Sequence, residues 1–530
     1  MNKILDWQQP YPSRRSPVCA RNIVATSQPL AVQSGLQALR EGGNAVDAAV
    51  AAAVTLTVVE PVMNGIGSDA FAMVWDGKRL WGLNASGRAP AAWTPERFGS
   101  MQTMPTEGWD AVTVPGAVSA WVALSKKFGR LPFTSLVQDA IRYAEEGFLV
   151  SPIVARQWAM QVPRLRQQPG FAEAFLPNGR APQAGEWFRL PDQAATLRRI
   201  AESEGRDFYE GETASRLASH SAAFGGALTR QDLAAHSVDW VDPLTWSYRG
   251  VDVAELPPNG QGVAVLMALG MLENFKLPES GSDSADSIHL QVEAMKLAFT
   301  DVYQNVSDPS GMRVSAANLL DYDYLRSRAH LIDPARAGTF AADLAAEPGT
   351  VYLTTADASG CMVSFIQSNY MGFGSGVVVP GTGVSLQNRG AGFNLLPNHP
   401  NRVSGGKRPF HTIIPGFATE KGEPLMSFGV MGGDMQAQGH LQIVVRIVDY
   451  RQNPQAAADA PRWKLAADGR LLVEESFGTE LLSALAQRGH SVVRMPAGSL
   501  EFGAAQVIRQ IAPGYVAGSE PRRDGQAAGF

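Results

Sequence analysis

The sequence predicts a layered α/β (α+β) fold in which helices cover β-hairpins. Two helical patterns come first: residues 29–40 carry apolar side chains at helical spacing, and the alanine-rich run 45–59 follows Asn44, a good N-terminal cap. A hairpin pattern then spans residues 70–83 around an Asp-Gly turn. Because each of these elements has one apolar face, the fold needs stacked layers to bury those faces.

The same two periodicities recur further along the chain. A helix is expected over residues 285–303, where apolar side chains recur at intervals of four, three and four. Residues 351–356 and 362–369 alternate on either side of a turn and predict a second hairpin. Shorter patterns predict helices at 441–451 and 478–488, and strands at 248–255, 471–473 and 491–494. The tail from Ser519 is rich in glycine and arginine, and we expect it to be frayed.

Composition limits the class of protein. The 530 residues are 45% hydrophobic and 18% charged, with a net charge of −5, which is typical of a globular chain with a large core. No cluster of lysine and arginine is present, so nucleic acid is not an expected partner. The most apolar run, 45–59, is too short to cross a bilayer, so we expect no membrane partner either.

Cysteine and histidine usage argues against metal and disulfide chemistry. Cys19 and Cys361 cannot form a disulfide framework and fit a reducing compartment. The eight histidines show no HExxH motif, no close pair and no cysteine neighbour. We therefore expect no metal and no cofactor. The first residues lack the apolar core of a signal peptide, so a cytoplasmic location is expected.

Residues 347–393 carry the candidate chemistry. Thr350 stands at the start of a predicted strand, directly after Gly349. If the bond between them is cut, the α-amino group of Thr350, with an ordinary pKa of about 7.7–8.0, can take the proton of its own hydroxyl. Most threonines at such a position only start a strand. The neighbouring motifs therefore decide between the two interpretations.

Those motifs resemble the γ-glutamyltransferase family of N-terminal-nucleophile hydrolases. The resemblance rests on GTVYLTTADASG, FGSG, GVSLQNRGAGF, GGKRPFHTIIP and VMGGDMQAQGH, and upstream stretches such as EGGNAVDAAVAAAVTLTVVEP agree in order. It implies a four-layer αββα sandwich and self-cleavage between Gly349 and Thr350. The large subunit would be 1–349 and the small subunit 350–530, together one αββα domain. A dimer of such heterodimers is left open.

The resemblance also assigns the catalytic groups. Thr350 is implied as nucleophile and base, and Ser368 as a hydroxyl that tunes it. Gly432 and Gly433 match the pair of the oxyanion hole. A Gly-Gly turn suits this task, because its backbone N–H groups can approach a developing negative charge closely.

The family's pattern for binding a γ-glutamyl group is broken in this chain. Ser86 stands where the transferases carry an arginine for the α-carboxylate, with Arg88 two residues on. Gly392 stands where an acidic residue holds the α-amino group, and Arg389 replaces a nearby glutamine. The side chains implied around the substrate are Arg389, Arg88, Ser86, Tyr370, His411 and Thr412.

These departures are similar to the amidohydrolase branch of the family, which includes cytoplasmic oxamate amidohydrolases of purine catabolism. We expect hydrolysis of a small anionic amide, with oxamate to oxalate and ammonia as the leading case, because arginine binds carboxylates through paired hydrogen bonds. Two alternatives stay open: a γ-glutamyltransferase or glutathione hydrolase, and an inactive relative that serves as a scaffold or binding protein. The missing anchors argue against the first, and the presence of Thr350 and Ser368 against the second.

Overall fold

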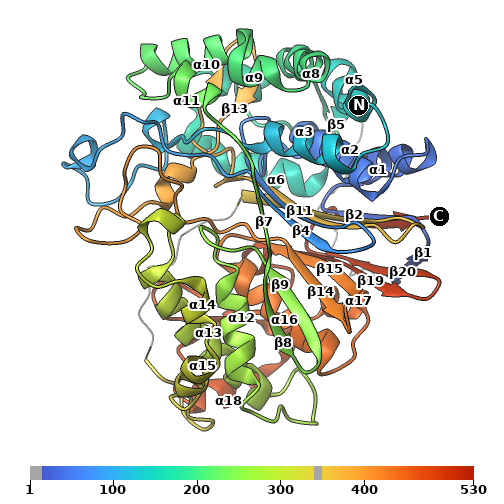
Figure 1. Cartoon of the computed structure of the whole chain (residues 1–530), viewed down its shortest axis with the longest axis vertical. Coiled ribbons are helices and arrows are strands. Elements are labelled where there is room, and N and C mark those ends of the chain that lie inside the picture. The colour runs from blue at the N-terminus through green and yellow to red at the C-terminus, as the bar shows by residue number, and fades with distance from the viewer. Residues whose placement is uncertain (1–14, 340–348) are drawn as a thin grey trace, which may run out of the picture.

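The computed structural model describes residues 15–339 and 349–530. Figure 1 shows four layers, in the order helices, sheet, sheet, helices. The described residues form two seven-stranded sheets, and every strand pair within these two sheets is antiparallel. The αββα architecture expected from the sequence is therefore confirmed.

The first sheet places the strand that begins at Gly349 at its centre. Its order is β21 (Gln526–Gly529), β2 (Ile23–Thr26), β10 (Gly349–Ala356), β11 (Met362–Tyr370), β3 (Asp69–Trp75), β4 (Leu80–Asn84) and β7 (Asp239–Val241). Both predicted hairpins, β3–β4 and β10–β11, are present. The sheet contains strands from both sides of the Gly349–Thr350 bond, so a cut at this point leaves two chains that share one sheet.

The second sheet also combines strands from before and after Gly349. Its order is β1 (Val18–Ala20), β20 (Gly514–Ser519), β19 (Ala504–Ile511), β15 (Glu423–Met431), β14 (Gly416–Glu420), β9 (Val251–Glu255) and β8 (Leu244–Tyr248). The strand predicted over 248–255 is present as β9, but it begins three residues later than expected. Arg249 and Gly250 both have positive φ, 53° and 84°, and turn the chain into the hairpin β8–β9.

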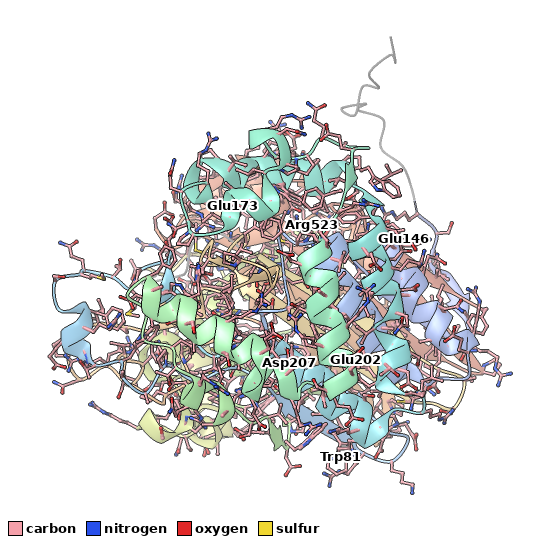
Figure 2. All side chains as sticks on the ribbon, turned by 90° about the horizontal axis from the view of Figure 1, so that it is seen from above. Trp81, Glu146, Glu173, Glu202, Asp207 and Arg523 are labelled. Atoms are coloured by element: carbon pink, nitrogen blue, oxygen red, sulfur yellow. The ribbon has the colours of Figure 1, made fainter. Side chains whose placement is uncertain are left out.

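Two groups of helices cover the outer faces of the sheets. The first sheet is covered by α1 (Pro29–Arg40), α2 (Ala45–Val59), α3 (Ala117–Phe128), α4 (Phe133–Leu136), α5 (Gln138–Glu146), α6 (Pro152–Leu165), α7 (Phe171–Phe175), α8 (Pro191–Ser203), α9 (Arg206–Glu210), α10 (Glu212–Ala223) and α11 (Arg230–Ala234). Figure 2 looks down on this layer, with Glu173, Glu202 and Asp207 marking α7, α8 and α9. No helix within the described ranges is long and apolar enough to span a membrane.

The second sheet is covered by helices from both halves of the chain. They are α12 (Val263–Leu272), α13 (Ala285–Asn305), α14 (Ala316–Leu319), α15 (Tyr322–Ala329), α16 (Met435–Val448), α17 (Pro454–Asp459) and α18 (Thr479–Gln487). Smaller sheets are β5 (Phe148–Leu149) with β6 (Trp187–Phe188), β12 (Val378–Val379) with β13 (Val384–Ser385), and β16 (Trp463–Leu465), β17 (Leu471–Glu474) and β18 (Val492–Met495). The helices predicted at 285–303 and 478–488 are confirmed as α13 and α18. The helix expected at 441–451 begins six residues earlier, as α16.

Apolar side chains fill all three spaces between the four layers. Between the two sheets, buried residues such as Phe71, Ile366, Phe417 and Ile508 meet. A helix such as α2 is buried along its whole length, because it lies between the first sheet and other helices. Its first turn is capped by Asn44, as the sequence predicts, and the side chain of Asp47 accepts a hydrogen bond from the backbone N–H of Asn44 in return.

The expectation that the tail frays after Ser519 is wrong. Strand β21 pairs with β2, and Arg522 is buried against two carboxylates, Glu474 at 2.5 Å and Glu520 at 2.7 Å. Glu520 also pairs with Arg462 at 2.8 Å. Burial alone would raise the pKa of Glu520, but the two guanidinium groups outweigh it and lower this pKa to about 2.

We predict that Glu520→Gln lowers the melting temperature at pH 7 and flattens its pH dependence in acid. A carboxyl whose pKa is depressed by folding stabilises above its unfolded pKa and loses that contribution as the pH falls through the folded pKa. In the unchanged chain the loss should therefore run from about pH 4.5 to about pH 2. Glu423→Gln, at an exposed position, is the control. Equal melting curves for both variants from pH 7 to pH 2 would contradict this account of the network.

Candidate active site

Thr350 lies at an irregularity of the central strand. In the β10–β11 ladder Gly349 is paired with Tyr370 and Val351 with Gln367, so Ser368 and Asn369 of β11 both stand opposite Thr350 and β11 carries a bulge. Its side chain is buried, as the residue is 2% exposed. Bulges re-aim side chains of the strand that carries them, and here the Ser368 hydroxyl lies in hydrogen-bond contact with that of Thr350.

Ser368 connects the candidate nucleophile with the candidate scissile carbonyl. Its Oγ lies 3.0 Å from Thr350 Oγ1 and donates a short hydrogen bond to the carbonyl oxygen of Gly349. The backbone N–H of Tyr370 donates to the same Oγ at 2.8 Å. Since a serine hydroxyl has one proton, Thr350 must be the donor in the Thr350–Ser368 bond. This arrangement polarises the carbonyl and gives the proton of Thr350 an acceptor.

The chain at this point tolerates only glycine before Thr350. A Cβ atom on Gly349 would lie 2.6 Å from the carbonyl carbon of Met371 and 2.7 Å from its oxygen. Next to this contact Tyr370 has a φ of 76°, in the left-handed region that is costly for a bulky residue. The close approach and the strain both lie beside the bond that the sequence predicts to be cut.

The two glycines of the predicted oxyanion hole join β15 to α16. Gly432 and Gly433 have φ values of 130° and 61°, which residues other than glycine rarely adopt. Gln436 follows in the first turn of α16, and its Nε2 lies 3.5 Å from Thr350 Oγ1. The first turn of α16 thus reaches Thr350 through Gln436. Sequence analysis did not single out Gln436, although the motif VMGGDMQ contains it.

Arg389 is a buried cation beside the end of β11. It is 1% exposed, its Nη1 donates to Thr412 Oγ1 at 3.1 Å, and its Cζ lies 3.9 Å above the ring of Tyr370. Its Nη2 has no hydrogen-bond partner among the residues that the structure describes. Burial lowers the pKa of Arg389 to about 10, against the attraction of neighbouring acidic groups, so the guanidinium remains charged at neutral pH.

Two acidic residues that sequence analysis missed lie near Arg389. Asp69 and Asp434 both attract the Arg389 guanidinium. Asp434 accepts a hydrogen bond from the Tyr303 hydroxyl at 2.7 Å. Asp434 follows directly after the paired glycines, so its position in that motif was the available signal.

His411 is held by Asp69 and is not in hydrogen-bond contact with Thr350. Its Nε2 lies 3.1 Å from Asp69 Oδ2, and both residues are fully buried. Burial lowers the pKa of His411 well below its usual range and raises the pKa of Asp69 to about 7. The imidazole is therefore neutral and donates its Nε2–H to Asp69. It positions the segment that carries Thr412.

Ser86 and Arg88 have other partners. Ser86 is buried, and its hydroxyl donates to Asn84 Oδ1 at 2.7 Å. Arg88 forms an ion pair with Asp308 at 3.2 Å, and its side chain is 49% exposed. Its charge is already neutralised near solvent, in contrast to that of Arg389. The structure therefore separates the two arginines that the sequence left as equal candidates.

Gly392 leaves no space for the acidic side chain found at this position in the transferases. A Cβ atom there would lie 2.6 Å from the carbonyl oxygen of Phe410. Thr350 and Arg389 are themselves buried, so neither side chain is open to solvent in the described structure.

Comparisons with known proteins agree with this geometry. The family model for gamma-glutamyltranspeptidase matches residues 31–530, and the chain belongs to this family. It is therefore a member of the N-terminal-nucleophile hydrolase enzymes, whose relatives are named hydrolases and amidohydrolases.

Three relatives illustrate the range of named activities. The chain is 38% identical to the oxamate amidohydrolase proenzyme of Klebsiella pneumoniae, over 97% of this chain and 99% of that protein. It is 36% identical to the glutathione hydrolase-like YwrD proenzyme of Bacillus subtilis, over 97% of this chain and all of that protein. The solved cephalosporin acylase from Bacillus halodurans is 48% identical and superposes with a TM-score of 0.95, covering 100% of this chain and 99% of that one.

We predict that Ser368→Ala slows cleavage of the chain on the order of 10²-fold, the usual contribution of a positioned proton acceptor. The variant loses both the acceptor for the Thr350 proton and the donor to the Gly349 carbonyl. The half-time of the uncut band on denaturing gels after expression measures the effect. Ser364→Ala is the matched control, since Ser364 is a buried serine of the same strand that bonds to Tyr352 instead. Equal half-times for both variants would remove Ser368 from the mechanism.

Proposed function

We propose that this chain is a self-processing N-terminal-nucleophile amidohydrolase that acts on a small amide bearing a carboxylate, with oxamate to oxalate and ammonia as the leading case. One observation carries the substrate class: the guanidinium of Arg389 is fully buried and keeps an unpartnered Nη2 among the described residues. A buried charge is costly unless it is paired. An anionic substrate would supply the partner.

Processing would begin at the Thr350 hydroxyl. Its Oγ1 attacks the carbonyl carbon of Gly349, while its proton moves through Ser368, which lies between the two groups. The Thr350 nitrogen takes the proton as its bond to the Gly349 carbonyl carbon breaks, so an ester to Oγ1 replaces the peptide bond, and water then hydrolyses the ester. The products are segments 1–349 and 350–530, and the second begins with a free α-amino group on Thr350.

Turnover would use the same oxygen. The α-amino group of Thr350 accepts the hydroxyl proton, and Oγ1 attacks the amide carbon of the substrate. The N–H groups of Gly432 and Gly433 would stabilise the oxyanion, because backbone donors at a turn of two glycines can approach a developing negative charge closely. The leaving nitrogen takes a proton and departs as ammonia. Water then hydrolyses the ester on Thr350 and releases the acid.

The positions of the charged groups favour a carboxylate over an amino acid substrate. A γ-glutamyl group needs an anion for its α-ammonium, and position 392, where the transferases provide it, is a glycine packed against Phe410. Arg389 instead offers a cation whose Nη2 is unpartnered among the described residues, and guanidinium groups bind carboxylates through strong charge-assisted hydrogen bonds. This supports the amidohydrolase over the γ-glutamyltransferase. The hydroxyl network at Thr350 supports an enzyme over an inactive scaffold.

Cephalosporin hydrolysis is a second candidate. The structural relative that is named a cephalosporin acylase is 48% identical over the whole chain, a higher value than that of the oxamate amidohydrolase relative. A cephalosporin also carries a carboxylate, so Arg389 could serve the same role. The two candidates differ in the size of the acyl group that the site must admit.

Thr350→Ala should abolish both cleavage and turnover, because it removes the single oxygen that both reactions use. Thr350→Ser keeps a hydroxyl and should retain part of each. Denaturing gels report cleavage, and ammonia release from oxamate reports turnover. Amide hydrolysis by the alanine variant at a substantial rate would rule out this mechanism.

Replacing Arg389 with Lys or Met should lower kcat/KM by the equivalent of about 2–4 kcal/mol, the usual cost of removing one member of a buried charged pair. Lysine cannot reproduce the two parallel hydrogen bonds. Arg88→Met is the control and should leave kcat/KM near the wild-type value, as its guanidinium is paired with Asp308. A large loss for Arg88→Met with none for Arg389→Met would exchange their roles.

A panel of three substrates separates the candidates. We expect ammonia release from oxamate and little p-nitroaniline release from a γ-glutamyl anilide. Efficient turnover of the anilide without turnover of oxamate would make the chain a γ-glutamyl enzyme. Cleavage of a cephalosporin side-chain amide without turnover of oxamate would favour the acylase candidate.

A further inference from the structure

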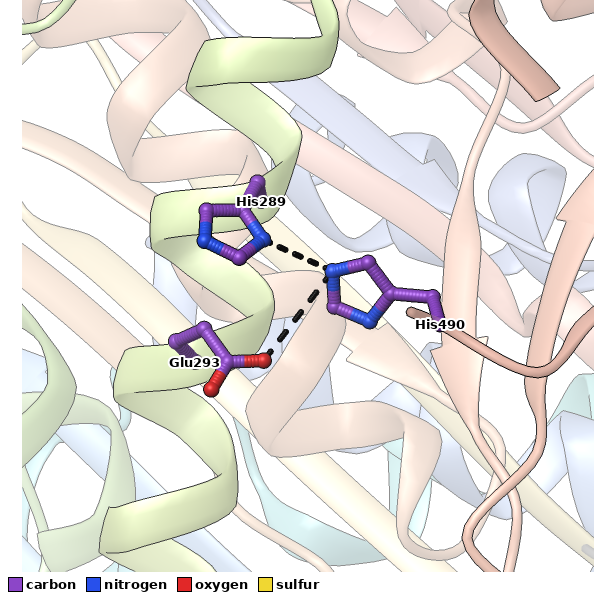
Figure 3. Close-up of side chains that lie close together, drawn as sticks. All are labelled: His289, Glu293 and His490. Atoms are coloured by element: carbon purple, nitrogen blue, oxygen red, sulfur yellow. Dashed lines mark hydrogen bonds and ion pairs between the residues drawn. The ribbon is translucent and has the colours of Figure 1, made fainter. Parts of the chain in front are cut away.

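A cluster of two histidines and a glutamate lies in the second helical layer, outside the site described above. Figure 3 shows His289 and Glu293 on successive turns of α13, with His490 pointing at them from the segment before β18. One ligand atom of each residue lies within 4.8 Å of the other two. Together these three residues offer two nitrogen atoms and one oxygen atom as possible ligands for a metal ion. All three are buried.

The side chains already point toward a common position. His289 Nδ1 lies 2.8 Å from His490 Nε2, and His490 Nε2 lies 4.0 Å from Glu293 Oε1. Zinc holds nitrogen and oxygen ligands at about 2.0–2.2 Å, which places two tetrahedral ligand atoms about 3.3 Å apart. The observed separations lie on both sides of this value. Small side-chain rotations would therefore bring the three atoms around one ion.

Neighbouring backbone groups fix the orientation of the donors. The Nε2–H of His289 donates to the carbonyl oxygen of Asp333 at 2.8 Å, which leaves the Nδ1 lone pair directed into the cluster. The other oxygen of Glu293, Oε2, accepts the backbone N–H of Gly338 at 2.9 Å. Metal-binding histidines and carboxylates are commonly supported in this way by a second set of hydrogen bonds.

We propose that His289 Nδ1, Glu293 Oε1 and His490 Nε2 form a binding site for a divalent transition-metal ion of the zinc type. Two imidazoles and one carboxylate suit such an ion better than calcium or magnesium, which prefer oxygen ligands. His490 carries its proton on Nδ1 when Nε2 binds the ion. Water completes the coordination.

Lys296 sets the strength of this site. Its ammonium group lies 2.7 Å from Glu293 Oε1 and 3.0 Å from the carbonyl oxygen of Gly338, and the residue is buried. It therefore competes with a metal ion for the same carboxylate oxygen and repels the ion. Replacing Lys296 by a neutral side chain should tighten metal binding, a change opposite to that expected for the ligands.

The site would join parts of the chain that are far apart in sequence. His289 and Glu293 precede the Gly349–Thr350 bond and His490 follows it. The backbone N–H of Ala337 also donates to the carbonyl oxygen of Arg488 at 2.7 Å, so the two parts already meet here. Where the proposed cleavage occurs, a bound ion would link the two subunits. Metal binding itself does not depend on the cleavage.

Cobalt provides the test, since Co²⁺ bound by few nitrogen and oxygen ligands absorbs visible light more strongly than the hydrated ion. The purified protein is freed of metal with a chelator, titrated with Co²⁺ and then challenged with Zn²⁺. We expect one Co²⁺ per chain, displaced by Zn²⁺. His289→Gln and His490→Gln should lose the absorption, and His330→Gln should keep it, because His330 is an exposed histidine outside the cluster. Thr350→Ala should bind like the wild type, which keeps this test separate from that of the proposed function.

Lys296→Met gives a second readout that misfolding cannot imitate. It should lower the dissociation constant for Co²⁺ on the order of ten-fold or more, since a competing positive charge is removed. Equal absorption in wild type, His490→Gln and His289→Gln, or no absorption in wild type and Lys296→Met, would overturn the proposal. The cluster would then be a hydrogen-bonded contact between α13 and the segment before β18.

Discussion

The hydroxyl of Ser368 is the contact on which the rest of the site depends. It stands between Thr350 Oγ1 and the carbonyl oxygen of Gly349, at the place where β11 bulges opposite Thr350. The bulge in turn requires glycine at 349, where any side chain would collide with Met371. The four layers serve this local geometry, since β10 is paired on both edges and cannot shift.

Burial makes the pairing of each charged side chain in this protein important for its free energy. Arg389 keeps an Nη2 without a partner among the described residues, whereas Arg522 and Arg462 are matched with carboxylates. Matched buried charges hold the fold together, and an unmatched one is retained where a ligand completes it. On this contrast rests our proposal that Arg389 serves a ligand while Arg462 and Arg522 serve the fold.

The sequence predicted those features that depend on local pattern. Periodicity located α1, α2, α13 and both hairpins of the first sheet. Periodicity missed the turn at Arg249, because a strand pattern can hide a two-residue turn. It also missed the order of the tail, because Glu474, a partner of Arg522, lies about 50 residues earlier in the chain. Resemblance supplied Thr350, Ser368 and Arg389. Asp69 and Gln436 come from distant elements, and only the fold brings them to Thr350 or Arg389.

The cluster around His289 shows the same limit. A histidine and a glutamate four residues apart on a helix are a visible signal, but the third member, His490, lies 201 residues away from His289. Sequence analysis therefore found no close pair of histidines. A helix face that carries both a histidine and a carboxylate is worth examining for a third ligand from another element.

The identity of the first residue of the smaller fragment tests the central claim most directly. Mass spectrometry and N-terminal sequencing of the purified protein should find a fragment that spans residues 350–530 and begins with Thr350. A single active chain of 56.7 kDa, or a fragment that begins at any other residue, would contradict the account.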